Sequence, residues 1–365
     1  MLRGLPSILS RAALAAALAL PACEQPPHEE ISRERAAALL DDRFAAGAAA
    51  WAKYCALCHG PEGHGYAADH APSLVSQTFL ESASDDFIAR GIREGRPGTA
   101  MAAYGKARGG PLDDDEVAAI ITFLRERGPA RMPLPLSKKA VVGEPERGEA
   151  VYEAHCKSCH GTRADRANAV HLANATLLAA ASDAFLRHAI VRGRPGTPMP
   201  GFQGVLRDDE IDDVVALLRS WAKPVRQDRR NPPEPPPLGE VVIHPSGKHP
   251  DFTLRADRYV PIADVKKALD EGKRIVIIDA RAPSDWFTGH IPGSISVPYY
   301  SFSRLDALPK DGTWITAYCA CPHHASGAVV DELRKRGFTH TAILDEGILE
   351  WKKRGYPMAS EPAPP

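Results

Sequence analysis

Hydrophobic and polar positions divide the chain into a helical part and a part where strands and helices alternate. In the helical part, two runs of apolar residues recur at helical spacing, from Val117 to Leu124 and from Ile211 to Leu218. A cluster of acidic residues precedes each run, at residues 113–116 and 208–210. Because acidic side chains in the first turn complement the helix dipole, each run predicts an amphipathic helix.

The pattern changes after a proline-rich stretch at residues 231–237, which predicts an extended, semi-rigid spacer. The continuous apolar and β-branched run of residues 274–279 predicts a buried strand. The further predicted strands are 314–318 and 341–344, and the predicted helices are 264–271, 326–336 and 348–354. Such alternation of strands and helices predicts an α/β domain built on a parallel sheet.

The helical part contains an internal repeat. The pattern G-x-x-x-[WY]-x-x-x-C begins at Gly47 and again at Gly148, and the phrase G-R-P-G-T-x-M ends at Met101 and at Met199. Each unit is predicted as a helix, a cysteine–histidine motif, an irregular loop, a methionine loop and a terminal helix. The two glycines are expected to let the first helix of each unit approach the last one closely.

Each repeat carries one copy of the motif C-x-x-C-H, the attachment signature of c-type haem. The copies comprise Cys55, Cys58 and His59, and Cys156, Cys159 and His160. Two thiols at this spacing can form thioethers with two vinyl groups, and the following histidine is then the proximal iron ligand. With this composition about 0.005 matches are expected by chance. The alternative is zinc, for which C-x-x-C is a half-site, although the two pairs lie too far apart for a zinc ribbon.

The repeat resembles class I cytochrome c, twice in tandem. The resemblance implies two covalently bound haem c groups, with Met101 and Met199 as distal ligands whose thioethers raise the reduction potential. Competing candidates for a distal ligand are His64, His70, His155, His171 and His188. In the family a proline packs near the proximal histidine. Pro72 occupies this place in the first repeat, whereas the second has Ala169-Val170-His171-Leu172.

The C-terminal α/β region resembles the rhodanese-like family. The matching phrases are Asp279-Ala280-Arg281, Gly289 to Ile295, Tyr318-Cys319 and Gly347 to Pro357. In the family, a cysteine after a central strand opens a loop at a helix N-terminus, where backbone N–H groups favour its thiolate. Cys319 occupies this position by resemblance.

The loop after Cys319 departs from the family pattern. It continues Ala320-Cys321-Pro322-His323-His324 and lacks the arginine that is common there. Four interpretations remain open. Cys319 is a sulfur-accepting nucleophile assisted by His323 or His324; Cys319 and Cys321 form a redox-active disulfide; the cysteines and histidines bind copper or zinc; or the domain is purely structural.

The N-terminus carries a targeting pattern. Arg3 and Arg11 are followed by an apolar stretch from Ala12 to Leu20, too short for a mature membrane span. The stretch ends in Leu20-Pro21-Ala22-Cys23, which resembles the lipobox of bacterial lipoproteins, so acylation of Cys23 is expected. The alternative is an ordinary cleaved signal peptide and a soluble periplasmic protein. A net charge of −1 argues against a general nucleic-acid binder.

We therefore predict two all-α cytochrome c domains and one α/β rhodanese-like domain with a mainly parallel sheet. The expected divisions are a signal peptide and lipobox at 1–23, a linker at 24–39, cytochrome domains at 40–128 and 146–223 joined by a linker at 129–145, a proline-rich extension at 224–257 and the rhodanese-like domain at 258–360. The expected function is electron transfer with redox partner proteins, coupled to oxidation of an inorganic sulfur compound or persulfide chemistry at Cys319. The alternative is an electron carrier whose rhodanese-like domain docks a redox partner, and enzyme activity stays open between them.

Overall fold

The computed structural model describes residues 33–225, 234–320 and 323–361. By internal contacts the chain divides into two units, Met1–Leu39 and Leu40–Pro365. The expected signal segment with Cys23, residues 231–233 of the proline-rich spacer, and Cys321 lie outside the described residues. Among the described helices, none is both long and apolar enough to cross a membrane.

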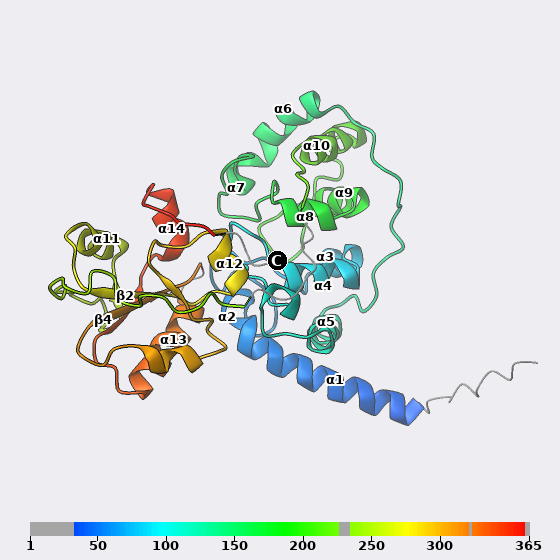
Figure 1. Cartoon of the computed structure of the whole chain (residues 1–365). Coiled ribbons are helices and arrows are strands. Elements are labelled where there is room, and N and C mark those ends of the chain that lie inside the picture. Colours follow the sequence, from blue (N-terminus) through cyan, green and yellow to red (C-terminus); the bar gives the residue numbers. More distant parts are fainter. Residues whose placement is uncertain (1–32, 226–233, 321–322, 362–365) are drawn as a thin grey trace, which may run out of the picture. The chain divides into compact units, whose positions relative to one another are not determined.

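The two helical repeats have the same order of α-helices, and the first repeat has a 3-10 helix in addition (Figure 1). The first comprises α1 (Arg33–Tyr54), α2 (Ala56–His59), α3 (Gln77–Ser82), α4 (Asp85–Glu94), the 3-10 helix η1 (Lys106–Arg108) and α5 (Asp114–Arg127). The second comprises α6 (Pro145–His155), α7 (Lys157–His160), α8 (Ala175–Ala180), α9 (Asp183–Arg192) and α10 (Asp208–Ser220).

The segment predicted as an irregular loop in each repeat contains two helices, so this prediction was wrong. Helices α3 and α8 have six residues each, which is less than two turns and too short for a periodic apolar pattern to emerge. Helices α4 and α9 carry a local signal that was missed. The side chains of Ser84 and Ser182 accept hydrogen bonds from the backbone N–H groups of Phe87 and Phe185 and cap these helices.

The first and last helices of each repeat cross at a glycine, as predicted. A Cβ atom at Gly47 would lie 2.0 Å from the carbonyl oxygen of Ala119 in α5. A Cβ at Gly148 would lie 2.2 Å from the carbonyl oxygen of Asp213 in α10. Any larger residue would therefore force the two helices apart.

An arginine of the last helix in each repeat bonds to the short helix α3 or α8, which the sequence pattern did not indicate. Arg125 donates to the carbonyl oxygens of Leu80 and Ala83, at 2.6 Å each. The corresponding residue of the second repeat, Arg219, donates to Leu178 and Ala181. The guanidinium groups thus satisfy carbonyl groups that the ends of α3 and α8 leave without helical partners.

The C-terminal region forms a five-stranded sheet in the order β1-β5-β4-β2-β3, and each of its four strand pairs is parallel. This confirms the predicted α/β architecture. The strands are β1 (Tyr259–Val260), β2 (Ile275–Asp279), β3 (Ile295–Ser296), β4 (Trp314–Tyr318) and β5 (Thr341–Leu344). The helices are α11 (Ile262–Asp270), α12 (Pro283–Thr288), η2 (Ser303–Ala307), α13 (His324–Lys335) and α14 (Gly347–Lys353).

Helices cover both faces of this sheet, which explains the continuous apolar run in β2 (Figure 1). Val276 and Ile278 pack in a core with residues of α13. Ile275 and Ile277 point to the opposite core, with residues of α11 and α14. All five residues of β2 are consequently buried.

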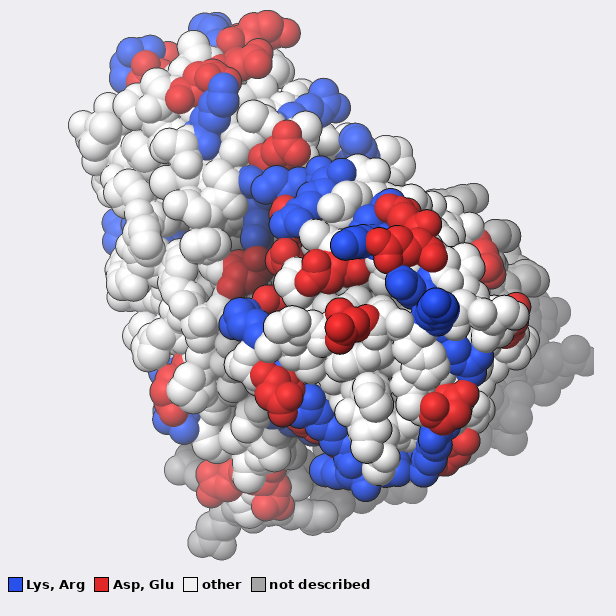
Figure 2. Space-filling view, turned by 90° about the vertical axis from the view of Figure 1, so that its left-hand side faces the viewer, with Lys and Arg blue, Asp and Glu red and all other residues white. Residues whose placement is uncertain are grey.

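On the face of the molecule shown in Figure 2, acidic and basic side chains are interspersed. This mixture accords with 45 basic and 46 acidic residues in the whole chain.

Candidate functional sites

Both cysteine–histidine motifs form the same tight turn after the first helix of their repeat. The carbonyl oxygen of Cys55 accepts hydrogen bonds from the N–H groups of Cys58 at 3.2 Å and His59 at 3.0 Å. The carbonyl oxygen of Cys156 accepts the equivalent bonds from Cys159 at 3.2 Å and His160 at 2.9 Å. The local fold therefore holds two thiols and an imidazole within one helical turn.

The imidazole ring of each motif is oriented by a backbone carbonyl group. Nδ1 of His59 donates to the carbonyl oxygen of Pro72 at 2.9 Å, and Nδ1 of His160 donates to that of Val170 at 2.8 Å. Val170 thus takes the place that proline has in the first repeat. Burial lowers the pKa of both histidines and favours the neutral ring. With Nδ1 protonated, the neutral ring presents Nε2 as the nitrogen that can bind a metal.

An aromatic residue of the first helix donates a hydrogen bond to the residue that follows each motif, a contact that was not predicted from the sequence. Nε1 of Trp51 donates to the carbonyl oxygen of Gly60 at 3.0 Å, and the hydroxyl group of Tyr152 donates to that of Gly161 at 3.0 Å. The repeated G-x-x-x-[WY] pattern was the available signal, because it places these two residues at equivalent positions.

The methionine loops of the two repeats share one hydrogen-bond pattern. In the first, the N–H group of Arg96 donates to the carbonyl oxygen of Met101 at 2.7 Å, and Oγ1 of Thr99 accepts from the N–H group of Met101 at 3.1 Å. The hydroxyl group of Thr99 also donates to the carbonyl oxygen of Arg96 at 2.7 Å. The same three bonds recur among Arg194, Thr197 and Met199.

A glycine with positive φ begins each methionine loop. The φ angles of Gly95 and Gly193 are 64° and 62°, in the left-handed region that glycine tolerates best. A Cβ at Gly95 would also lie 2.5 Å from the backbone of Ala102, and one at Gly193 would lie 2.4 Å from that of Pro200. These close approaches give both loops the same compact shape around their methionines.

The chemistry of the residues fits covalent haem. Burial is the main cause that raises the pKa of Cys55 to about 12 and that of Cys58 to about 11, so both thiols stay neutral. Two thiols at this spacing suit thioether formation with the two vinyl groups of haem. Haem also carries two carboxylates, and each methionine loop holds a half-buried arginine of opposite charge. Burial lowers the pKa of Arg96 and of Arg194 to about 10.

The competing histidines have other surroundings. His64 and His70 are exposed. His155 packs against the ring of Phe202 at 5.9 Å, and His171 Nε2 donates to the carbonyl oxygen of Thr162 at 3.2 Å. His188 Nε2 lies 3.5 Å from a carboxylate oxygen of Glu81. Over the described ranges, no three or more His, Cys, Asp or Glu side chains group together to hold a metal ion.

Cys319 directly follows β4 and is almost completely enclosed, with 2% of its surface exposed. Its Sγ atom lies 3.3 Å from Oγ of Ser326, and its carbonyl oxygen accepts from the N–H group of Ile348 at 3.1 Å. Helix α13 begins at His324, two residues before the predicted start. The thiol therefore lies beside the first turn of this helix.

The two loop histidines face different neighbours. His323, whose φ is 71°, lies with Nε2 3.1 Å from Oδ1 of Asp345 and also contacts the carbonyl oxygen of that residue. The ring of His324 lies 5.6 Å from that of Tyr299, and its imidazole lies close to the backbone of Lys53. Burial lowers the pKa of His324, so its imidazole is neutral near neutral pH.

The Cys319 loop lies against the first cysteine–histidine motif within the unit Leu40–Pro365. The rings of Tyr54 and Tyr299 are 6.3 Å apart, and Tyr54 also lies 6.1 Å from Tyr104. After burial and the charge of Asp69, the charge of Cys319 is a further cause that raises the pKa of Cys58. The end of α1 thus links the two candidate sites.

Comparison with protein families assigns the three regions. The model for cbb3-type cytochrome c oxidase subunit III matches residues 42–124 and 143–218, and the rhodanese-like domain model matches residues 262–354. The chain therefore contains two cytochrome c domains in tandem and a C-terminal rhodanese-like domain. Cytochrome c domains bind haem c covalently and transfer electrons, and this is the class of protein that the fold and the motifs define.

Curated relatives match parts of the chain. A cbb3-type cytochrome c oxidase subunit CcoP from Azospirillum sp. is 29% identical over 53% of this chain and 66% of its own length. A dihydro-heme d1 dehydrogenase from Pseudomonas aeruginosa is 34% identical over 32% of this chain and 27% of its own length. The matches thus span less than two thirds of either relative.

Two solved structures each match about a quarter of the chain. A rhodanese-related protein from Thermoplasma volcanium is 25% identical, with 28% of this chain and 99% of that chain covered and a TM-score of 0.26. A rhodanese-like domain from Anabaena sp. is 30% identical, with 28% and 78% covered and a TM-score of 0.26.

Proposed function

We propose that this chain is an exported dihaem c-type cytochrome that transfers electrons through two His/Met haems. The observation that carries the proposal is the duplication of both half-sites. In each repeat, Nδ1 of the motif histidine donates to a backbone carbonyl oxygen. Each repeat also has a methionine in a separate loop, and the two methionine loops have the same hydrogen-bond pattern.

Each residue has one role in this proposal. Cys55 and Cys58 hold the first haem and Cys156 and Cys159 hold the second. His59 and His160 are the proximal ligands. Met101 and Met199 are the distal ligands. Bound haem supplies a one-electron carrier, and thioether ligation favours its ferrous form. With a histidine and a methionine bound to each iron, these residues would exclude substrate and oxygen from it, so the proposed function is electron transfer with redox partner proteins.

The proposed location is the periplasm, with the protein held at a membrane surface by a lipid on Cys23. A positive, apolar N-terminal segment that ends in the lipobox-like residues 20–23 supports this location. Membrane fractionation of wild type and Cys23→Ser tests it. A soluble wild-type protein without lipid mass would leave only the cleaved-signal alternative.

We further propose that the rhodanese-like domain couples sulfur oxidation to the first haem. The contacts of Tyr299 with Tyr54 and of His324 with Lys53 support this pairing, because they bring the Cys319 loop to the end of α1, next to Cys55. Hydrosulfide represents the class of substrate. One S–S bond forms between it and the Cys319 thiolate, and one proton and two electrons are released. Two ferric haems are the matching class of oxidant.

The experiment uses the full holoprotein and anaerobic sulfide. We expect wild type to show haem reduction and a persulfide mass adduct on Cys319, and Cys319→Ser to lose both, while chemical reduction by dithionite is unchanged. Tyr54→Ala should slow sulfide-dependent haem reduction and formation of the persulfide adduct together, because the two electrons released by S–S bond formation go to the haems. Phe252→Ala is the control, because Phe252 packs in the core on the other face of the sheet. If Cys319→Ser and Cys321→Ser lose sulfide-dependent haem reduction equally and wild type shows no adduct on Cys319, the disulfide pair is favoured. If wild type binds a metal that either variant loses, the metal site is favoured.

The alternative function is a non-catalytic carrier whose rhodanese-like domain docks a redox partner. The observation that favours it is the burial of Cys319, since a thiol with 2% exposure is poorly placed to meet a substrate. A wild-type protein that sulfide neither modifies at Cys319 nor reduces at its haems would establish this alternative.

A further inference from the structure

The two cytochrome domains pack as an internal counterpart of a two-fold symmetric dimer. Phe87 in α4 and Phe185 in α9 occupy equivalent positions after their capping serines, and their ring centroids lie 4.5 Å apart. Contact between equivalent residues is the mark of an isologous interface, in which each contact recurs with the partners exchanged. The buried residues of both domains accordingly form one hydrophobic cluster.

Two threonines make the reciprocal contact at the methionine loops. Oγ1 of Thr78, in α3 of the first domain, donates to the carbonyl oxygen of Gly193 at 2.6 Å. Oγ1 of Thr176, in α8 of the second domain, shares its proton between the carbonyl oxygen of Gly95 at 3.0 Å and Oδ1 of Asn174 at 2.8 Å. Both hydroxyl groups belong to buried residues, and both acceptors are the first residue of a methionine loop of the other domain.

The side chains around this pair differ between the two halves. Beside Thr176, the Nδ2 atom of Asn174 donates to the carbonyl oxygen of Pro97 at 3.0 Å, which adds a second bond to the first methionine loop. The equivalent residue of the first domain is Ser76, whose hydroxyl is buried without a hydrogen-bond partner. Arg194 lies beside Thr78, with Nη1 3.3 Å from its Oγ1.

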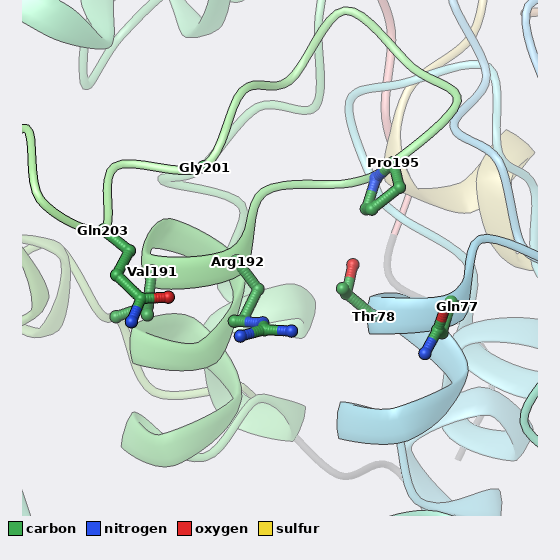
Figure 3. Close-up of a pocket in the computed structure, with 7 residues that line it drawn as sticks. All are labelled: Gln77, Thr78, Val191, Arg192, Pro195, Gly201 and Gln203. Atoms are coloured by element: carbon green, nitrogen blue, oxygen red, sulfur yellow. The ribbon is translucent and has the colours of Figure 1, made fainter.

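A cavity of about 280 Å³ lies beside Thr78 and contacts the second methionine loop. Figure 3 shows Thr78 and Gln77 on α3 facing Pro195 and Arg192 across this space. The packing is therefore incomplete on this side, and the hydroxyl of Thr78 is a localised link between α3 and the loop.

We propose that Thr78 and Thr176 are crossed positioning residues, each holding the methionine loop of the other cytochrome domain. The first methionine loop then depends on Thr176, and the second depends on Thr78. The consequence for ligation of the two irons rests on the proposed His/Met function. The consequence for loop order does not, because the hydrogen bonds are made by the chain itself.

Hydrogen exchange on the full holoprotein tests the crossed dependence directly. Thr176→Val should speed exchange of the backbone amides of residues 95–101 about tenfold and leave residues 193–199 unchanged, since one buried hydrogen bond is lost. Thr78→Val should do the reverse. Thr122→Val is the matched control, because its hydroxyl bonds at 3.1 Å to Ala118 within its own helix. Thr176→Ser and Thr78→Ser keep a hydroxyl and should restore slow exchange.

A second readout reports on the irons. The Met199→His variant removes the methionine of the second haem, so the methionine–iron absorption band that remains belongs to the first haem. In this variant, Thr176→Val should tighten imidazole binding at the first haem about tenfold. Thr78→Val should leave imidazole binding there unchanged. If that band is absent before any threonine is changed, the proposed His/Met ligation is wrong. The hydrogen-exchange result then tests the crossed contact by itself. The inference would be overturned if exchange became faster in the methionine loop of the domain that carries the substituted threonine, or equally in both methionine loops. It would also be overturned if exchange rose no more than in Thr122→Val.

Discussion

Gly47 of helix α1 packs directly on the backbone of Ala119 in α5, so closely that a Cβ atom would lie 2.0 Å from the Ala119 carbonyl oxygen. This contact places the end of α1, and with it the first cysteine–histidine motif, against the terminal helix of the first cytochrome domain. Gly148 and Asp213 repeat the relationship in the second domain.

Gly47→Ala is therefore expected to destabilise the first cytochrome domain. The added methyl group meets backbone atoms that cannot turn away, and overpacking of this kind costs about 1–3 kcal/mol. Chemical denaturation followed by helical circular dichroism measures the effect. Gly239→Ala is the control, because its Cβ would meet nothing within 4 Å. A Gly47→Ala protein as stable as Gly239→Ala would contradict the close helix crossing.

Loss of either methionine should open one iron to external ligands. Met101→Ala and Met199→Ala each remove one proposed thioether ligand, so each protein should bind CO at one of its two ferrous haems, whereas wild type should bind none. CO difference spectra and whole-protein mass report ligand access and haem number. Met132→Ala is the control, since that side chain is 78% exposed outside both loops. If neither variant binds CO, another residue is the distal ligand.

Asp213 should make the stability of the second cytochrome domain depend on acid pH. Its carboxylate accepts from Arg147 at 2.8 and 2.9 Å and from the N–H group of Glu144 at 2.6 Å. The hydrogen bonds from Arg147 are the first cause that lowers the pKa of Asp213 below its ordinary value of 3.8. A lowered folded-state pKa means that this stabilisation is complete above about pH 4 and is lost as the pH falls through the folded value.

Asp213→Asn should consequently lower the free energy of unfolding at pH 7, and its difference from wild type should shrink below about pH 4. Denaturant titrations at several pH values give this difference. Asp86→Asn serves for comparison, because Asp86 is an exposed residue in the first turn of α4. A difference that stays constant from pH 7 to pH 3 would exclude the bond network as its origin.

Much of the architecture could be predicted from sequence because the signals are local. The β-branched run at residues 275–279 indicates a strand that is buried on both faces of a sheet. The acidic clusters at the start of α5 and α10 indicate where these helices begin. Helices α3 and α8 escaped prediction, since six residues are too few to show a period and long-range contacts hold them. The arginines at 125 and 219 supply those contacts from more than 35 positions along the chain.

The sequence by itself determined the candidate ligands and the duplicated plan, because covalent haem attachment needs two thiols and a histidine at a fixed spacing in one stretch of chain. Only the tertiary structure decided which carbonyl groups accept the hydrogen bonds of His59 and His160. Every residue has a carbonyl oxygen, so the amino-acid sequence does not identify the acceptor. It likewise paired Thr78 with Gly193, Thr176 with Gly95 and Tyr54 with Tyr299. Those contacts join residues that are remote in sequence, and packing of the apolar faces alone brings them together.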